Sequence, residues 1–410
     1  MSARRVVERA FQDQQLAPAL TGRPTHVIAV GKAAAAMAAA IYHVSPTRAE
    51  TLLAIGTHGS EQLPPEVEWI EASHPFPDAR SQAAGDRAVA VAQKVHSDEA
   101  LVILLSGGAS ALMAAPIEGV TLQEKIATTR LMMNAGADIH ALNTVRRHLS
   151  KVKGGRLAAA CVGTTVTIAL SDVVGNDLNA IGSGPGVPDP TTWADAAAAL
   201  ERFGGRAHAA SVRAAIAQGQ AGALPDTPKP GDASMRRARA KVVGSRTDAM
   251  HAARDAAQAL GYDAIVMADA VTGEARDVAP GWLELVKAVA VGARRPLCVI
   301  SSGETTVTVN GPGLGGRNLE FALALAEPLA AAGSYTVASV GTDGIDGTSG
   351  VAGAVVDSTT LQRAERQGLG APGGYLANND SFAYFAPLDD VVRLGRTDTN
   401  VGDLQVVLID

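Results

Sequence analysis

The chain has 410 residues, of which 47% are hydrophobic and 3% aromatic, and its formal net charge is −6. This length allows a large buried core, and typical domain sizes favour two domains. The acidic balance and scarce aromatic residues exclude the basic, stacking surfaces of nucleic-acid binders, and two cysteines, Cys161 and Cys298, do not make a disulfide framework.

Neither end of the sequence nor its interior predicts a membrane association. The first residues, MSARRVVERAFQDQQL, lack the apolar core and small-residue cleavage site of a signal peptide, and no apolar run is long enough to cross a bilayer. We therefore expect a cytoplasmic protein with no nucleic-acid or membrane partner. The sequence leaves the oligomeric state open, a homo-oligomer included.

Short apolar runs alternate with Ala-rich segments along the chain. The runs predict buried strands, and the Ala-rich segments predict helices. The predicted strands are 26–30, 101–105, 165–170, 264–268 and 297–301, and the predicted helices are 33–41, 84–95, 254–260 and 319–330. This alternation predicts an α/β fold with mainly parallel sheets.

A Pro- and Gly-rich segment, 219–235, marks the expected domain boundary. We predict a first α/β domain, layered like a Rossmann fold, over residues 1–235, and a smaller α/β domain with some antiparallel strands over 236–410. The segment 298–310 has two strand-like halves around Ser302, Gly303 and Glu304, and its polar and apolar residues alternate in the second half. This pattern predicts an antiparallel hairpin exposed on one side.

Polar and glycine residues follow three of these runs and the further apolar run TVASV (336–340). They are Gly31 and Lys32, the stretch 106–110, Ser171 and Asp172, and the stretch 341–344. Ligands of open α/β sheets bind outside the carboxyl ends of the strands. We therefore expect these four segments to face one cleft between the two domains.

The first two of these segments have the chemistry of an anion site. Ser106, Gly107, Gly108 and Ser110 enter a predicted helix, where backbone N–H groups and the helix dipole favour a phosphate or a carboxylate. A tight strand-to-helix turn explains the same residues equally well. Lys32 could neutralise a transferring phosphoryl group, or reach out to solvent.

A basic stretch, 143–155, is unusual in an acidic protein. It places Arg146 and Lys153 among the candidates for binding an anion, although most charge runs are solvated helix faces. His148 fits a local hydrogen-bonding or surface role better than that of a general base.

Two glycine-rich loops follow later in the chain. Gly311, Gly313 and Gly316 form a G-x-G-x-x-G pattern, but the strand before it is amphipathic and the next acidic strand end, Asp343, lies too far away for a dinucleotide fingerprint. We interpret these glycines as a flexible loop that presents Arg317 and Asn318, with Arg317 suited to holding a carboxylate or phosphate.

The second loop, 341–350, carries Asp343 and Asp346. Such a loop could bind a divalent cation through oxygen atoms, or form a simple turn. No Walker A, protein-kinase or HExxH motif and no paired CxxC is present, so the sequence identifies no metal ligands.

Taken together, these motifs resemble the class II glycerate kinases, the glycerate 2-kinase family whose carboxyl-terminal part is called the MOFRL domain. The resemblance runs nearly from end to end. It rests on VGKAAAAM (30–37), SHPFPD (73–78), LLSGGASALM (104–113), NTVRRHLSKVKGGRLA (143–158), SDVVGNDLNAIGSGP (171–185), SSGETTV (301–307), GGRNLEFAL (315–323), GTDGIDGTSGVAGAVVD (341–357), NNDSF (378–382) and TDTNVGD (397–403).

The resemblance implies two α/β domains, ATP with Mg²⁺ as co-substrate, D-glycerate as substrate and 2-phosphoglycerate as product. It implies that Lys32, Asp172 and Arg317 are the catalytic residues, and it adds Glu304 and Asn379 to the binding candidates. Two alternatives stay open at this point: an NAD(P)H-dependent hydroxypyruvate reductase, and a non-catalytic sensor of sugar acids.

Overall fold

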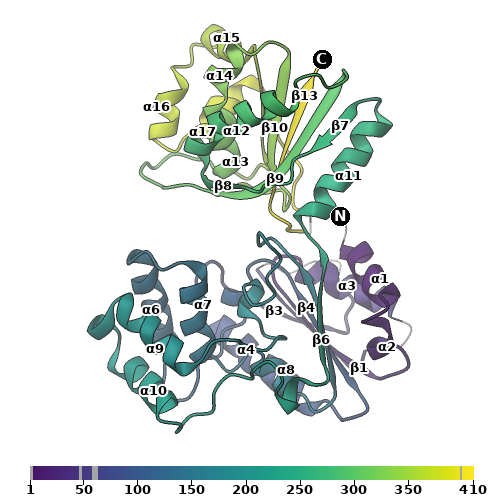
Figure 1. Cartoon of the computed structure of the whole chain (residues 1–410), viewed down its shortest axis with the longest axis vertical. Coiled ribbons are helices and arrows are strands. Elements are labelled where there is room, and N and C mark those ends of the chain that lie inside the picture. The colour runs from purple at the N-terminus through teal and green to yellow at the C-terminus, as the bar shows by residue number, and fades with distance from the viewer. Residues whose placement is uncertain (1–2, 46–48, 58–62, 398) are drawn as a thin grey trace. The chain divides into compact units, whose positions relative to one another are not determined.

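A computed structural model describes residues 3–45, 49–57, 63–397 and 399–410. The chain divides into two compact units (Figure 1). The N-terminal unit comprises Ser2–Leu170 and Gly175–Val243, and the C-terminal unit comprises Ser171–Val174 and Gly244–Asp410.

The N-terminal unit is built on a six-stranded sheet in the order β3-β2-β1-β4-β5-β6. Its strands are β1 (Thr25–Val30), β2 (Thr51–Gly56), β3 (Val67–Glu71), β4 (Ala100–Leu105), β5 (Thr164–Leu170) and β6 (Ala238–Gly244). The pairs among β1 to β5 are all parallel. Every residue of β1 and β4 is buried, which explains why these strands are continuous apolar runs.

The strand order makes the ends of β1 and β4 the expected binding position. The chain runs from β1 through β2 to β3 on one side, and from β4 through β5 to β6 on the other, so the topology reverses between β1 and β4. Ligands of doubly wound sheets bind at such a switch point, outside the carboxyl ends of the strands. Gly31 and Ser106, which follow β1 and β4, stand at that point.

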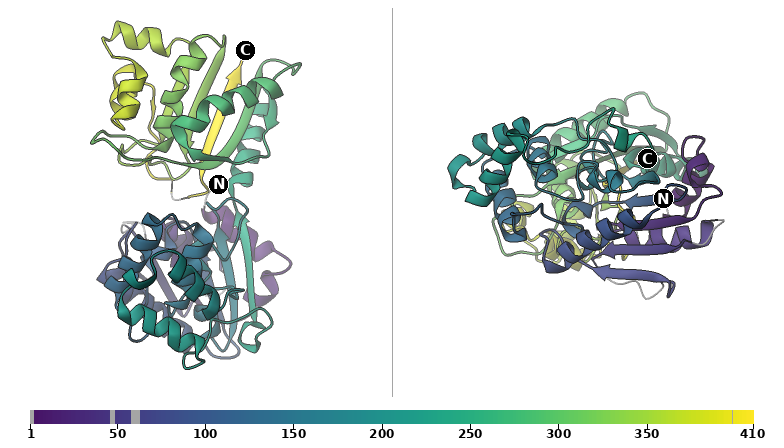
Figure 2. Two further views of the ribbon diagram at one scale, coloured as in Figure 1. Left: turned by 60° about the vertical axis from the view of Figure 1, so that its left-hand side comes forward. Right: turned by 90° about the horizontal axis from the view of Figure 1, so that it is seen from below.

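Helices cover both faces of this sheet and also form a separate group (Figure 1). The helices are α1 (Ala3–Gln12), α2 (Ala17–Leu20), α3 (Ala34–Val44), α4 (Ala79–Lys94), α5 (Ala109–Leu112), α6 (Leu122–Asn134), α7 (Ile139–His148), α8 (Arg156–Ala159), α9 (Trp193–Arg202) and α10 (Ala210–Gln220). In that separate group, α6, α7, α9 and α10 share a second hydrophobic core centred on Val145, Trp193 and Leu200. Figure 2 shows the same group from two further directions.

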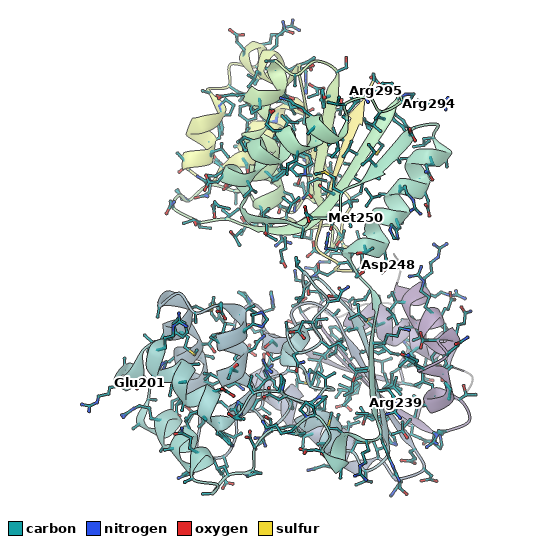
Figure 3. The ribbon with its side chains drawn as sticks, in the orientation of Figure 1. Glu201, Arg239, Asp248, Met250, Arg294 and Arg295 are labelled. Atoms are coloured by element: carbon teal, nitrogen blue, oxygen red, sulfur yellow. The ribbon has the colours of Figure 1, made fainter. Side chains whose placement is uncertain are left out.

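The last strand of this sheet lies beyond the boundary that the sequence predicted. The boundary at residue 235 precedes β6, whereas the compact units change over after Val243. The run that looks like the first strand of a new domain is therefore the edge strand of the first sheet, and Arg239 lies on it (Figure 3).

The C-terminal unit has a seven-stranded mixed sheet in the order β12-β11-β10-β13-β9-β7, with β8 paired to β9. Its strands are β7 (Asp263–Val266), β8 (Val271–Glu274), β9 (Leu297–Thr306), β10 (Tyr335–Gly341), β11 (Gly353–Asp357), β12 (Val391–Val392) and β13 (Asp403–Ile409). Strand β13 is antiparallel to both β10 and β9, and β7 and β8 are parallel to β9. The prediction of an α/β unit with some antiparallel strands is confirmed.

Helices cover both faces of the C-terminal sheet as well. They are α11 (Arg246–Ala259), α12 (Ala275–Val289), α13 (Arg317–Ala324), α14 (Ala326–Ala330), α15 (Thr360–Arg366), α16 (Pro372–Ala377) and α17 (Ser381–Phe385). The larger core lies under α12 and α13 and includes Trp282 and Phe321. Met250 of α11 packs with Cys298 and Ile300 on the opposite face (Figure 3).

The predicted hairpin at 298–310 is wrong. Strand β9 continues without a turn from Leu297 to Thr306, and it pairs with β13 on one side and with β7 and β8 on the other. Gly303 does not turn the chain; it lets the backbone of Val271 come close, because a Cβ at Gly303 would lie 1.9 Å from the Val271 carbonyl oxygen. The glycine is therefore needed for the approach of β8.

Among the described residues, no helix combines the length and the apolar character needed to cross a membrane.

Candidate functional site

The carboxyl ends of β1 and β4 are joined directly. Gly31 adopts a φ of +130°, and a Cβ there would lie 2.1 Å from the Ser106 hydroxyl oxygen. Only glycine allows this approach. The Lys32 N–H then donates to the Gly107 carbonyl oxygen at 2.9 Å, and the Ala33 N–H donates to the buried Ser106 hydroxyl at 3.0 Å. Predicted site residues from two strand ends thus form one unit of structure.

A cavity of about 270 Å³ opens beside these strand ends. Loop 74–77, the turn into α5, and one side each of α6 and α7 line it. Helix α6 begins with a capping box of Thr121 and Glu124. Lys125, Ile126 and Met133 then lie on the helix face that lines the cavity, as helical periodicity requires.

Three basic side chains line this cavity, and we call it the cationic pocket: Lys125 of α6, Arg146 of α7 and Lys153 of the following loop. Lys125 is 6% exposed and Lys153 is 1% exposed. The Lys153 ammonium donates to the Ser110 carbonyl oxygen at 2.8 Å and to the Ser110 hydroxyl at 3.1 Å. The Lys125 ammonium donates to the Leu149 carbonyl oxygen at 3.0 Å.

No acidic side chain balances these charges among the described residues that line the pocket. Burial, together with the charges of Arg146 and Arg156, lowers the pKa of Lys125 to about 7. Burial and the neighbouring cations also lower the pKa of Lys153 well below its ordinary value. Burial alone lowers the pKa of Arg146 to about 10. Buried cations without counter-charges are costly, so the pocket favours an anion.

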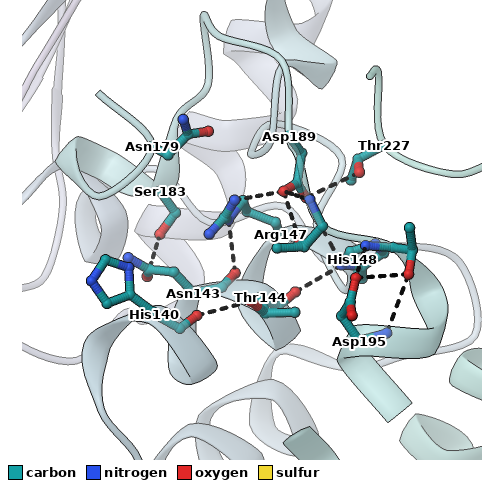
Figure 4. A network of polar contacts seen from close by, with 12 residues as sticks. His140, Asn143, Thr144, Arg147, His148, Asn179, Ser183, Asp189, Asp195 and Thr227 are labelled. Carbon is teal, nitrogen blue, oxygen red and sulfur yellow. Dashed lines mark hydrogen bonds and ion pairs between the residues drawn. The ribbon is translucent and has the colours of Figure 1, made fainter. Parts of the chain in front are cut away.

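The remaining charges of the basic stretch have a different role. The Arg147 guanidinium donates to the buried Asp189 carboxylate at 2.5 Å, and Thr227 donates to the same carboxylate at 3.0 Å (Figure 4). The buried His148 ring bonds the Thr144 carbonyl oxygen at 2.8 Å and Asp226 at 3.0 Å. These residues hold α7 in place, so Arg146 is left as the arginine of this helix that lines the pocket.

Lys32 and His74 lie at the edge of the same region. A Cβ at Gly108 would contact the His74 ring at 3.1 Å and the Lys32 side chain at 3.6 Å, so the two side chains converge on this glycine. Burial, and then the charge of Lys32, lowers the pKa of His74. A largely neutral imidazole at the pocket wall leaves the positive charge to the lysine and arginine side chains.

In the C-terminal unit the candidate residues form a network of paired charges, which we call the Arg317 cluster: Arg317, Asn318, Asp346 and Asp403. Arg317, the first residue of α13, donates from Nε to Asp403 at 2.6 Å and from Nη2 at 2.9 Å. Burial opposes the charge of Arg317, but the Asp403 carboxylate raises its pKa overall. Glu304 lies 3.6 Å from Nη1.

Asp346 caps α13 in the same cluster. Its carboxylate accepts the N–H groups of Asn318 at 3.1 Å and Leu319 at 2.9 Å. Burial raises the pKa of Asp346 to about 6, although these two N–H groups counteract the shift. Asn318 also donates its amide to Asp403 at 2.9 Å. The N-terminus of α13 is thus occupied by a carboxylate of the protein itself.

The glycine loop before α13 is held in place. Asn379 accepts the N–H groups of Asn310 at 2.7 Å and Gly311 at 2.9 Å, and its amide donates to Glu320 at 2.7 Å. A Cβ at Gly313 would lie 2.5 Å from the Asn378 carbonyl oxygen. These glycines permit close backbone contacts with segment 378–380, so the interpretation as a flexible loop does not describe this arrangement.

Two further predicted residues lie in the C-terminal unit. Asp172 accepts a hydrogen bond from the Asn400 amide at 2.9 Å. The Asp343 side chain accepts the N–H of Ile345 at 3.2 Å, as in an Asx turn. Among the described residues, no three or more His, Cys, Asp or Glu side chains are grouped as a metal site.

Comparisons with known proteins decide the family. Residues 1–217 match the model of a domain of unknown function, DUF4147, and residues 297–403 match that of the MOFRL family. A D-glycerate 2-kinase of Thermotoga maritima is 34% identical over 98% of this chain and 95% of its own. The crystal structure of a glycerate kinase from T. maritima superposes with a TM-score of 0.86, covering 100% of this chain and 97% of that one.

The chain belongs to the class II glycerate kinases. Other relatives carry two different names. A glycerate 2-kinase of Pyrococcus horikoshii is 35% identical over 94% of this chain and 87% of its own, and a putative hydroxypyruvate reductase of Agrobacterium vitis is 37% identical over 100% and 95%. The resemblance seen in the sequence is thereby confirmed.

Within this glycerate kinase fold the structure sorts the predicted residues into two groups. Of the predicted residues, those that line the cationic pocket are Gly108, Ser110, Arg146 and Lys153, and those at the joined strand ends beside it are Gly31, Lys32, Ser106 and Gly107. The others belong to the C-terminal unit: Asp172, Glu304, Arg317, Asn318, Asp343, Asp346 and Asn379. Helix α5 has only four residues, so the positive field at the Ser106–Ser110 turn comes from the cationic side chains more than from a helix dipole.

Sequence reasoning missed Lys125 and His74 in the pocket, and Asp403 beside Arg317. The SHPFPD motif was a signal for His74, since it recurs among the features shared with the family. Lys125 gave no signal, because one lysine on an amphipathic helix is indistinguishable from a solvated one until the neighbouring helices are placed.

Proposed function

We propose that the protein transfers the γ-phosphoryl group of ATP to the 2-hydroxyl group of D-glycerate and forms 2-phosphoglycerate. The observation that carries this proposal is the cationic pocket beside the switch point of the sheet, where three basic side chains meet no acidic one among the described lining residues. Such a site favours a polyanion. The family membership and the relatives named as glycerate 2-kinases support the same reaction. We also infer a cytoplasmic location, which the two unpaired, buried cysteines favour.

Positioning and charge stabilisation account for most of the catalysis of phosphoryl transfer. We assign Lys32 to the charge that develops on the transferring group. We assign Asp172, held by Asn400, to orienting the attacking hydroxyl or accepting its proton. Lys32 belongs to the N-terminal unit and Asp172 to the C-terminal unit.

Arg317 is assigned to the glycerate carboxylate or a phosphate oxygen. Asp403 occupies its Nε and Nη2 edge, so a ligand would meet Nη1, from which the exposed Glu304 carboxylate lies 3.6 Å away. The ion pair fixes the plane of the guanidinium before a ligand arrives. Little conformational entropy is then lost on binding.

A magnesium ion fits this residue set as a companion of the nucleotide. Mg²⁺ commonly binds to substrate phosphates with only one or two carboxylates from the protein, which is compatible with Asp172 as an oxygen donor. When bound, the ion neutralises charge on the β- and γ-phosphates. Removal of Mg²⁺ with EDTA should abolish turnover, and full activity in EDTA would exclude this role.

Two observations at the start of α13 disfavour the alternative of a hydroxypyruvate reductase. A dinucleotide fingerprint needs free N–H groups at the start of its helix for the pyrophosphate, but Asp346 already accepts those of Asn318 and Leu319 at the start of α13. The G-x-G-x-x-G pattern also follows β9 only after the 307–310 segment, instead of forming a tight strand-to-helix turn.

A product assay tests the proposal. Purified protein is incubated with D-glycerate and ATP/Mg²⁺, and ³¹P NMR follows the γ-phosphate; parallel samples contain glycerate with NAD(P)⁺ or hydroxypyruvate with NAD(P)H. We expect the 2-phosphoglycerate signal to grow and the nicotinamide absorbance to stay constant. Nicotinamide turnover without phosphate transfer would identify a reductase, and inactivity in every sample would favour a sensor.

A further inference from the structure

The cationic pocket has a second wall of a different character. Its rim carries Phe76, which is 39% exposed, and Met133, which is 51% exposed, with Pro75 and Ile126 beside them. The Arg130 guanidinium lies 4.3 Å from the centre of the Phe76 ring and holds it in a cation–π contact. The pocket therefore combines a buried cationic end with an apolar, aromatic rim.

The charge of the buried end selects the kind of anion. Lys125, Arg146 and Lys153 together face no acidic residue among those that line the described pocket. A single carboxylate would balance only one of these cations. A chain of phosphates carries several negative charges within a few ångströms and offers oxygen acceptors to all three side chains.

We propose that this pocket is the nucleotide site of the N-terminal unit: Lys125, Arg146 and Lys153 bind the phosphates, and the rim formed by Phe76 and Met133 holds the base. This assignment rests on the proposed kinase function, and it names Lys125, Phe76 and Met133 as nucleotide-binding residues. The volume of the cationic pocket, about 270 Å³, lies just below the usual range of small-molecule sites. Apolar walls with a few placed charges are typical of such sites.

Arg146 is the residue to change first. No hydrogen bond or ion pair joins its guanidinium to another described residue, so Arg146→Gln removes charge from the pocket without breaking a contact of the fold. The matched control is Lys151→Gln, because Lys151 is an exposed cation of the same stretch that does not line the pocket. For the rim, Met133→Glu is paired with Ile139→Glu, an exposed apolar residue outside the pocket.

Isothermal titration calorimetry without turnover tests the assignment, with ADP, tripolyphosphate and D-glycerate as separate probes. Arg146→Gln should lower the affinity for ADP and for tripolyphosphate roughly 10- to 100-fold, as expected for loss of a charge-assisted contact. The affinity for glycerate should stay unchanged. Met133→Glu should lower the affinity for ADP, whose base contacts the rim, much more than the affinity for tripolyphosphate, which has no base. Both controls should bind like the wild type, and circular dichroism should show that every variant is folded.

Two results would overturn the proposal. If Arg146→Gln lowers the affinity for glycerate and leaves the affinity for ADP unchanged, the pocket is the site of the substrate carboxylate. If Arg146→Gln and Met133→Glu both bind ADP as the wild type does, the nucleotide lies elsewhere. These outcomes can be distinguished from failure of the proposed function. If the protein binds ADP in this pocket but transfers no phosphate, the kinase function is refuted and the nucleotide site stands. If it transfers phosphate but Arg146→Gln and Met133→Glu bind ADP normally, the kinase function stands and the nucleotide site is refuted.

Discussion

The Arg317 cluster and the cationic pocket treat their charges in opposite ways. In the Arg317 cluster each buried charge has a partner within the protein: Arg317 with Asp403, and Asp346 with the start of α13. In the cationic pocket three basic side chains meet no carboxylate among the lining residues that the structure describes. Paired charges hold a fixed arrangement, whereas unpaired charges remain available to a ligand. We therefore infer that the Arg317 cluster holds its side chains in a fixed orientation, and that the cationic pocket binds the charge of a ligand.

The largest effect is expected at Lys32. If it stabilises charge on the transferring phosphoryl group, Lys32→Ala should lower kcat about 10²- to 10³-fold with little change in KM for glycerate, because the contact strengthens only in the transition state. Steady-state kinetics with ATP and D-glycerate measure both constants. A raised KM with an unchanged kcat would place Lys32 in ground-state binding and remove it from the catalytic residues.

Removing a paired cation should destabilise the fold. Arg317→Gln leaves the Asp403 carboxylate buried, 1% exposed, without its arginine, which should cost about 3 kcal/mol in the free energy of unfolding. Urea denaturation measures this loss, with Arg294→Gln as a control at an exposed arginine (Figure 3). A loss below about 1 kcal/mol would show that Asp403 does not depend on Arg317 and would weaken the contrast between the units.

Removing an unpaired cation should have the smallest effect on stability. Arg146→Gln takes a charge out of a crowded cationic site, so the free energy of unfolding should change by less than about 1 kcal/mol or increase. The same urea titration serves for both variants, with Lys151→Gln as the matched control. A loss as large as that of Arg317→Gln would mean that Arg146 has a structural partner and would break the comparison.

Local patterns in the sequence sufficed for much of the fold. Buried runs such as 101–105 and Ala-rich segments such as 84–95 predicted strands and helices that the structure contains, because burial on both faces leaves a continuous apolar signature. The alternation at 298–310 misled the prediction of a hairpin. It reflects an extended β9 whose later residues are alternately buried and exposed, and Gly303 serves β8 instead of a turn.

The site residues that the sequence predicted are those that depend on short segments of the chain. Strand-end residues such as Lys32 and Ser106 follow their strands directly, so the sequence names them. The ion pair of Arg317 with Asp403 joins residues 86 positions apart, and Lys125 reaches the pocket only because α6 lies beside α7. Such contacts depend on tertiary packing, which no short pattern encodes.

The contrast between the cationic pocket and the Arg317 cluster is tested most directly by the number of protons taken up when ADP binds. Burial, together with the charges of Arg146 and Arg156, gives Lys125 a pKa of about 7, so in the free protein it is mostly neutral at pH 8. Phosphates beside it should raise this pKa and restore the proton. Affinity should then fall by up to about tenfold per unit as pH rises above 7.

Calorimetry at pH 8 in buffers of different ionisation enthalpy measures this uptake. We predict an uptake of close to one proton per ADP by the wild type, and a smaller number by Lys125→Met. Binding of ADP without proton uptake, or with the same uptake in Lys125→Met, would contradict the claim that the unpaired cations of this pocket bind the phosphates.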